Sequence, residues 1–104
     1  MKLKMGEDNY RGLLALVECE HNRAEALAKA GENSSNPYHK LSSLWLKALI
    51  ANDLRQKDRT AKLYQQIVSA DADIDTKQQA SLETDIVLMD VRQERWDRGI
   101  SCRF

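Results

Sequence analysis

Three aspartates alternate with other residues in the segment 71–75, and this is the spacing with which a calcium-binding loop opens. That loop also requires glycine at its sixth position and a bidentate glutamate at its twelfth. Here those positions hold Thr76 and Leu82, and Glu83 comes one residue late. We therefore interpret the segment as an acidic turn that caps the helix following it.

Cys19 and His21 form a second candidate site, because a thiol near an imidazole can bind a metal or act as a nucleophile beside its base. We expect both residues in the middle of one helix, where side chains two positions apart point in different directions. His39 is the only other histidine, and no cysteine or histidine pair has zinc spacing. The sequence thus favours an unreactive helical cysteine and a half-buried histidine.

The common motifs for acyl transfer, phosphate binding and hydride transfer do not occur in the sequence. Asp85, Asp90 and Glu94 have spacings that would allow acid–base work, but with Arg92 and Arg95 among them they are typical of a solvated helix face. We therefore predict no enzyme, no cofactor, and no catalytic, cofactor-binding or metal-binding residues.

Positive charge gathers in the middle of the chain. Residues 37–70 carry six Lys and Arg against two Asp, while residues 1–36 and 71–104 are acidic and the whole chain is neutral. The basic segment 40–62 could contact phosphates, which makes a small DNA-binding regulator one alternative. The neutral overall charge makes binding to nucleic acid the weaker interpretation.

Apolar residues recur every three or four positions and predict four helices, at residues 9–30, 37–55, 59–69 and 76–98, with a flexible tail at 99–104. The predicted fold class is all-α, either a four-helix up-and-down bundle or a stack of helical hairpins. The short link after the second helix predicts that the second and third helices are antiparallel neighbours.

The ends of these helices carry their own signals. Gly31 can end the first helix in a left-handed conformation, and Gly99 can end the last one. Asn36 before Pro37 is a strong start signal, because asparagine accepts from free amides and proline needs no amide of its own there. Asp58 can cap the third helix.

The length of 104 residues fits one domain, and the 42% hydrophobic content can supply a core without disulfides. Two cysteines, Cys19 and Cys102, are too few for a disulfide scaffold, so we expect reduced thiols and a cytoplasmic location. The N-terminus lacks the apolar run of a signal peptide, and no stretch is apolar enough to span a membrane, so no membrane partner is expected.

Residues 44–73 resemble a degenerate tetratricopeptide repeat, a helix–turn–helix unit of 34 residues. The matching positions are Leu44, Ala48, Thr60, Tyr64 and Ile67. The sequence departs from the pattern at Lys47, where an apolar residue is usual, at Ala51, where an aromatic one is usual, and in lacking the final proline. The resemblance implies a scaffold that offers a concave helical surface to a segment of another protein.

The two tryptophans are the remaining clue, and we expect both in the core, since large aromatic side chains dominate core burial. A partly exposed Trp96 would instead indicate a docking anchor. The candidate interaction residues are Trp45, Met89, Trp96, Ile100 and Phe104.

The sequence therefore predicts a non-enzymatic protein–protein interaction module, either an adaptor or chaperone-like protein for another protein or a self-associating homodimer. A second alternative, besides the DNA-binding regulator, is an inhibitor or immunity-type protein that captures a basic partner with the acidic last third of the chain.

Overall fold

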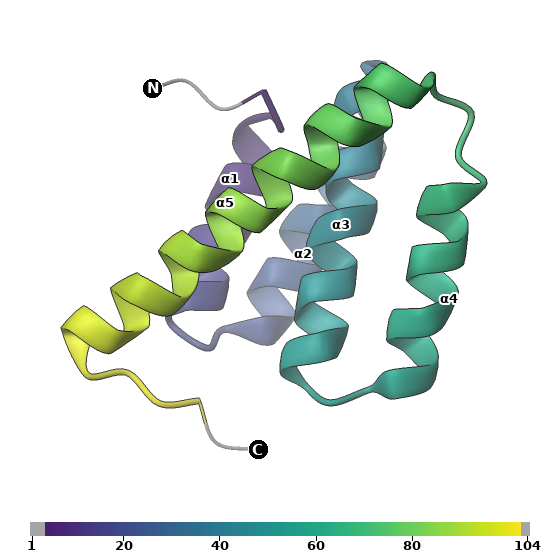
Figure 1. The fold of residues 1–104 in the computed structure, drawn as a ribbon. Helices are drawn as coiled ribbons and strands as arrows, with labels where there is room; N and C mark the ends of the chain where they lie inside the picture. The colour runs from purple at the N-terminus through teal and green to yellow at the C-terminus, as the bar shows by residue number, and fades with distance from the viewer. Residues whose placement is uncertain (1–3, 103–104) are drawn as a thin grey trace.

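The structure is a computed structural model that describes residues 4–102, and these residues form five helices and no strand (Figure 1). The all-α fold class is confirmed. The helices are α1 (Glu7–Val17), α2 (His21–Glu32), α3 (Pro37–Asp53), α4 (Lys57–Val68) and α5 (Ile74–Arg98). No helix in the described part of the chain is both long and apolar enough to cross a membrane.

The predicted single helix over residues 9–30 is wrong, because the chain turns between α1 and α2. Cys19 adopts a left-handed backbone conformation with φ of 61°. The turn is closed by backbone hydrogen bonds from Glu18 and Glu20 to the carbonyl of Ala15 and from Cys19 to that of Leu16. The apolar repeat continues in helical phase on both sides of the turn, so periodicity alone could not reveal it. The other three predicted helices agree with α3, α4 and α5 to within two residues at each end.

Consecutive helices from α1 to α4 pack against one another, and α1 also contacts α3. The predicted neighbours α3 and α4 do lie side by side, joined by a short link (Figure 1). The long helix α5 crosses α1 and α3 diagonally and makes few contacts with α4. One face of α5 is therefore buried against α1 and α3, and its opposite face has no helix over it.

A buried polar network joins α1 to α3 inside the core, and α2 packs against it. Asn9 Nδ2 donates to the carbonyl oxygens of Met5 at 2.8 Å and His39 at 3.0 Å, and Ser43 Oγ donates to Asn9 Oδ1 at 2.9 Å. Gly31 lies against this network, and a Cβ atom there would come within 2.4 Å of Ser43 Oγ. The prediction that Gly31 ends a helix is thus wrong, since α2 continues through it and glycine serves close packing instead.

Three predicted helix signals have the expected geometry. The Asn36 side chain accepts from two backbone amides ahead of Pro37, at the start of α3. Gly99 ends α5 with φ of 65°. Asp73 accepts from the Thr76 amide at 2.7 Å, so the acidic turn caps α5 as predicted. The predicted cap at Asp58 is wrong, because α4 already begins at Lys57.

Candidate functional site

The outward face of α5 carries large apolar side chains that no other helix within residues 4–102 covers. Leu82, Ile86, Met89 and Trp96 are exposed by 63, 51, 69 and 82%. Their spacing of four, three and seven residues places them on one side of the helix, with Gln93 filling the gap. We call these four residues the α5 stripe. The side of α5 that packs into the core is formed instead by Val87 and Val91.

Only some of the candidate interaction residues lie on the α5 stripe. The expectation that Trp96 is a core residue is wrong, and the structure puts it on the same face as Met89. Trp45 is half-buried between α3 and α4, with its ring centre 5.7 Å from that of Tyr64. Ile100 is half-buried against the core, and Phe104 lies outside the described residues. The structure therefore joins Met89 and Trp96 but separates Trp45 and Ile100 from them.

Charged residues border the α5 stripe on both edges. Asp85 and Arg92 come directly before Ile86 and Gln93, and so lie along one edge. Asp90 and Asp97 come directly after Met89 and Trp96, and so lie along the other. All four are exposed. The stripe thus has one mixed edge and one acidic edge.

A hollow of about 540 Å³ lies beside the acidic edge, between α1 and α5. Its apolar lining includes Leu14, which is 50% exposed, together with Val87 and Val91, and Glu94 is among its polar residues. The hollow is partly open to solvent. It offers a second, smaller apolar surface on the same side of the molecule as the stripe's acidic edge.

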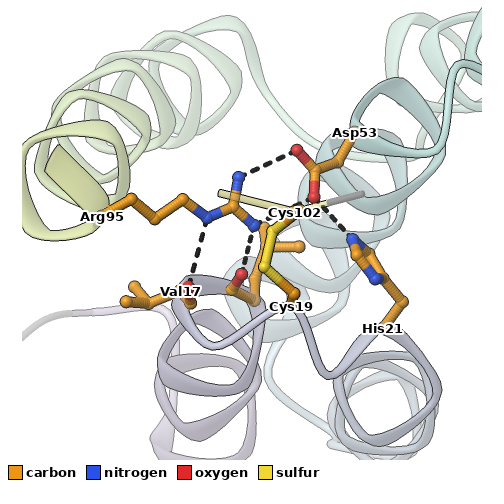
Figure 2. Close-up of polar contacts among 7 residues, drawn as sticks. Val17, Cys19, His21, Asp53, Arg95 and Cys102 are labelled. Atoms are coloured by element: carbon orange, nitrogen blue, oxygen red, sulfur yellow. Dashed lines mark hydrogen bonds and ion pairs between the residues drawn. A yellow bond between two sulfur atoms is a disulfide. The ribbon is translucent and has the colours of Figure 1, made fainter. Parts of the chain in front are cut away.

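Cys19 and Cys102 are joined by a disulfide, with their Cα atoms 5.5 Å apart (Figure 2). The expectation of reduced thiols is therefore corrected for the form described here. The prediction that Cys19 lies inside a helix is wrong, because Cys19 occupies the turn between α1 and α2. The disulfide also ties the tail to this turn, so residues 99–102 are held against the body of the protein rather than being a free extension.

Arg95 and His21 converge on the carboxylate of Asp53 at the same corner (Figure 2). Arg95 donates to both carboxylate oxygens at 3.0 Å, and His21 Nε2 lies 2.6 Å from Oδ2. Arg95 also donates to the backbone carbonyls of Leu16 and Val17, which end α1. With only 16% of its side chain exposed, Arg95 does not belong to the solvated helix face that the sequence predicted for it.

The ionisation of Asp53 follows from these contacts. Burial by itself would raise the pKa of the carboxyl group, but hydrogen bonds from Arg95 and His21 outweigh that effect and hold the pKa below its ordinary value. Asp53 is therefore an ionised carboxylate near neutral pH, positioned between two nitrogen groups and beside the disulfide.

Sequence analysis missed Asp53 and did not connect Cys102 with Cys19 and His21. One available signal was the position of Asp53 at the end of α3. A carboxylate there lies near the negative end of the helix dipole, which is unfavourable unless a cationic side chain pairs with it. The identity of that partner depends on α5 crossing back over the turn between α1 and α2. This crossing joins residues that lie 42 and more positions apart.

Some of the positive side chains of the hairpin formed by α3 and α4 are paired with glutamates of α2, so fewer of them are available to a partner than the composition suggests. Lys47 forms an ion pair with Glu32, and Arg59 forms one with Glu25. Both glutamates belong to α2, so two of the six cations hold the helices together rather than facing outward.

No protein-family model, curated protein or solved structure matches this chain.

Proposed function

We propose that this chain is a non-enzymatic protein-interaction module whose α5 stripe binds a second copy of the chain. The observation that supports the proposal most directly is the exposure of four large apolar side chains on one helix face. Exposed apolar surface gathered on one face typically marks an interface, because its burial contributes roughly 25 cal/mol of stabilisation per Å² of apolar area.

The helix arrangement supports α5 as the docking element. We take α1 to α4 as stacked hairpins of the kind that the tetratricopeptide resemblance implies, with α1 and α3 forming the face that such scaffolds offer to a partner. In this chain α5 covers that face itself. The stripe on the outer side of α5 is then an apolar surface left for a partner.

The pattern of the stripe is self-complementary about Met89. Leu82 and Trp96 each lie seven residues from it, and Asp85 and Arg92 lie four and three residues from it. In an antiparallel pair with its two-fold axis near Met89, Leu82 of one copy therefore packs on Trp96 of the other. The same axis sets Asp85 beside Arg92 of the second copy, and opposite charges at such edge positions favour pairing.

The solution mass of the oxidised protein, measured by light scattering or sedimentation over a range of concentrations, tests this proposal. We expect a dimer, and we expect Met89→Glu to make it monomeric. Asp85→Arg and Arg92→Asp should each weaken the dimer, and the double variant should restore it, because the swapped charges attract again. Asp75→Arg, a charge reversal near the start of α5, is the control that should leave the mass unchanged.

A monomeric wild-type protein would overturn the proposal. Retention of one defined heterologous protein by that monomer would favour an adaptor that uses the hollow between α1 and α5. Salt-dependent retention on DNA would favour the regulator that uses the basic hairpin.

The proposed location depends on the redox state. Disulfides persist in oxidising compartments, so the disulfide-bonded form fits such a compartment. The cytoplasmic location predicted from the sequence is proposed for the reduced chain only.

A further inference from the structure

The corner beneath the disulfide brings together four side chains that are all ligands of zinc. Cys19 lies in the turn between α1 and α2, His21 begins α2, Asp53 ends α3, and Cys102 lies in the tail (Figure 2). The ligand atoms of His21, Asp53 and Cys102 all lie within 4.8 Å of one another, and Cys19 is bonded to Cys102. Four elements thus deliver two sulfurs, one nitrogen and one oxygen to a single point.

We propose that, after reduction of the Cys19–Cys102 disulfide, Cys19, His21, Asp53 and Cys102 bind one Zn²⁺ ion. Zinc in proteins takes cysteine sulfur, histidine nitrogen and carboxylate oxygen in four-coordinate tetrahedral sites. Its usual bond lengths place neighbouring ligand atoms about 3.3–3.8 Å apart. His21 Nε2 and Asp53 Oδ2, at 2.6 Å, need to separate only slightly to admit the ion, and the two sulfurs separate when their bond is broken.

The turn at Cys19 removes the sequence-based objection to this site. Within one continuous helix, Cys19 and His21 would point in different directions. With Cys19 in a left-handed conformation ahead of α2, both side chains face the same centre. The other two ligands come from distant parts of the chain, so no local zinc spacing exists for a sequence motif to show.

The positive charge of Arg95 would balance the net negative charge of such a zinc site. Two thiolates and one carboxylate carry three negative charges, Zn²⁺ offsets two of them, and the guanidinium of Arg95 offsets the third. Arg95 donates to both oxygens of Asp53, and Oδ2 also faces His21, so the bond from Nη1 to Oδ1 is the one that holds the carboxylate when Oδ2 turns to the ion. Arg95 is therefore a positioning residue, in the way that partners of zinc-bound carboxylates orient their ligands.

The redox and proton balance of the change is simple. A dithiol reductant supplies two electrons and two protons and itself becomes a disulfide, while the sulfur–sulfur bond of Cys19 and Cys102 breaks to give two thiols. Both thiols lose their protons when Zn²⁺ binds, so binding releases two protons at pH values below the thiol pKa. A small-molecule disulfide reverses the change by thiol–disulfide exchange, because it accepts two electrons from the thiolates of Cys19 and Cys102 and two protons from water, becomes two thiols, and leaves the cysteines joined and the ion released.

Titration with Co²⁺, a spectroscopic substitute for zinc, tests the proposal. The full chain is reduced with a phosphine, freed of excess reductant under argon, and titrated with Co²⁺. We expect one ion per chain, with a thiolate-to-cobalt charge-transfer band and the intense visible bands of tetrahedral cobalt, both abolished by one equivalent of Zn²⁺. The oxidised protein should show neither band.

Matched variants distinguish this site from adventitious binding. Cys102→Ser should weaken Co²⁺ binding at least about tenfold and reduce the charge-transfer band, as should His21→Gln. His39→Gln, at the other histidine, and Asp75→Asn, at an exposed carboxylate, should change neither. Zn²⁺ should also raise the melting temperature of the reduced wild type but not that of the oxidised protein, which provides a measure independent of the variants.

Two results would overturn the proposal. One is a reduced protein that binds no more Co²⁺ than the variant carrying both Cys19→Ser and Cys102→Ser. The other is a cobalt spectrum that is unchanged by Cys102→Ser. Neither result would bear on dimerisation through the α5 stripe, which is tested on the oxidised protein without metal.

Discussion

Arg95 and Asp53 form a two-pronged ion pair, in which Nη1 meets Oδ1 and Nη2 meets Oδ2, each at 3.0 Å. The pair connects α5 to the end of α3, and Arg95 continues to the carbonyl oxygens of Leu16 and Val17 at the end of α1. A single guanidinium therefore joins the ends of three helices. Because the last carbonyls of α1 have no partner within their own helix, Arg95 also serves as that helix's cap.

Replacement of Arg95 by lysine should destabilise the protein by about 2 kcal/mol, because an ammonium cannot make the paired contacts with Asp53 and reach both carbonyls as well. Urea unfolding of the oxidised protein measures the loss. Arg92→Lys, on the exposed side of the same helix, should change stability by less than about 0.5 kcal/mol. Equal losses at the two positions would contradict the role we assign to Arg95.

The stabilising effect of Asp53 should disappear in acid. Its pKa is lowered in the folded protein, so the ionised carboxylate stabilises the fold at pH values above the unfolded-state pKa, which is about 3.9. That contribution is lost as the pH falls through the lower, folded-state pKa. Unfolding curves of wild type and Asp53→Asn should therefore differ at pH 7, begin to approach each other as the pH falls below about 4, and converge only below the folded-state pKa of Asp53. A difference that stays constant down to pH 3 would show that charge is not its cause.

Loss of the disulfide should cost about 2–4 kcal/mol of stability, because the bond closes a long loop and so restricts the unfolded chain. The variant carrying both Cys19→Ser and Cys102→Ser should match the chelator-treated, reduced wild type in its melting temperature and fall well below the oxidised wild type. Chelation matters to this comparison, since bound zinc would stabilise only the reduced wild type. Identical melting temperatures for oxidised and chelator-treated reduced wild type would contradict the prediction.

Removal of one charge at the centre of the acidic edge should tighten the dimer. A two-fold axis near Met89 brings Asp90 of each copy close to Asp90 of the other, and like charges in such positions oppose pairing. Asp90→Asn should therefore lower the dimer dissociation constant severalfold in sedimentation experiments, with the larger effect at low salt. Asp75→Asn makes the same charge change away from the axis and should have no effect. A weaker dimer in Asp90→Asn would rule out the antiparallel register.

The fold could be predicted from the sequence where local chemistry decides the structure. The cap at Asn36 with Pro37, the left-handed end at Gly99 and the acidic cap at Asp73 depend on a few neighbouring atoms, and each has the predicted geometry. The break at Cys19 was not predictable in this way. Its left-handed conformation interrupts no apolar repeat and uses no glycine, and the disulfide that accompanies it depends on the far end of the chain.

The candidate sites were likewise predictable from the sequence only where local pattern decides them. The apolar repeat over residues 76–98 predicted the helix α5, but periodicity does not say which of its apolar side chains another helix covers. That depends on α5 crossing α1 and α3 with Val87 and Val91 inward, which only the packed structure reveals. Likewise, Arg95 looked like a surface residue because its partners Leu16, Val17 and Asp53 lie far from it in sequence.

The disulfide turns most of the protein into a covalent ring, since Cys19 and Cys102 are 83 positions apart and all of α2 to α5 lies between them. A protease that cuts once within this ring, for example in the link between α3 and α4, opens the ring without separating any fragment. Such a nicked molecule keeps its full mass on a gel until a reductant is added. Circular permutation at the same link should likewise be tolerated more readily in the oxidised form than in the reduced one.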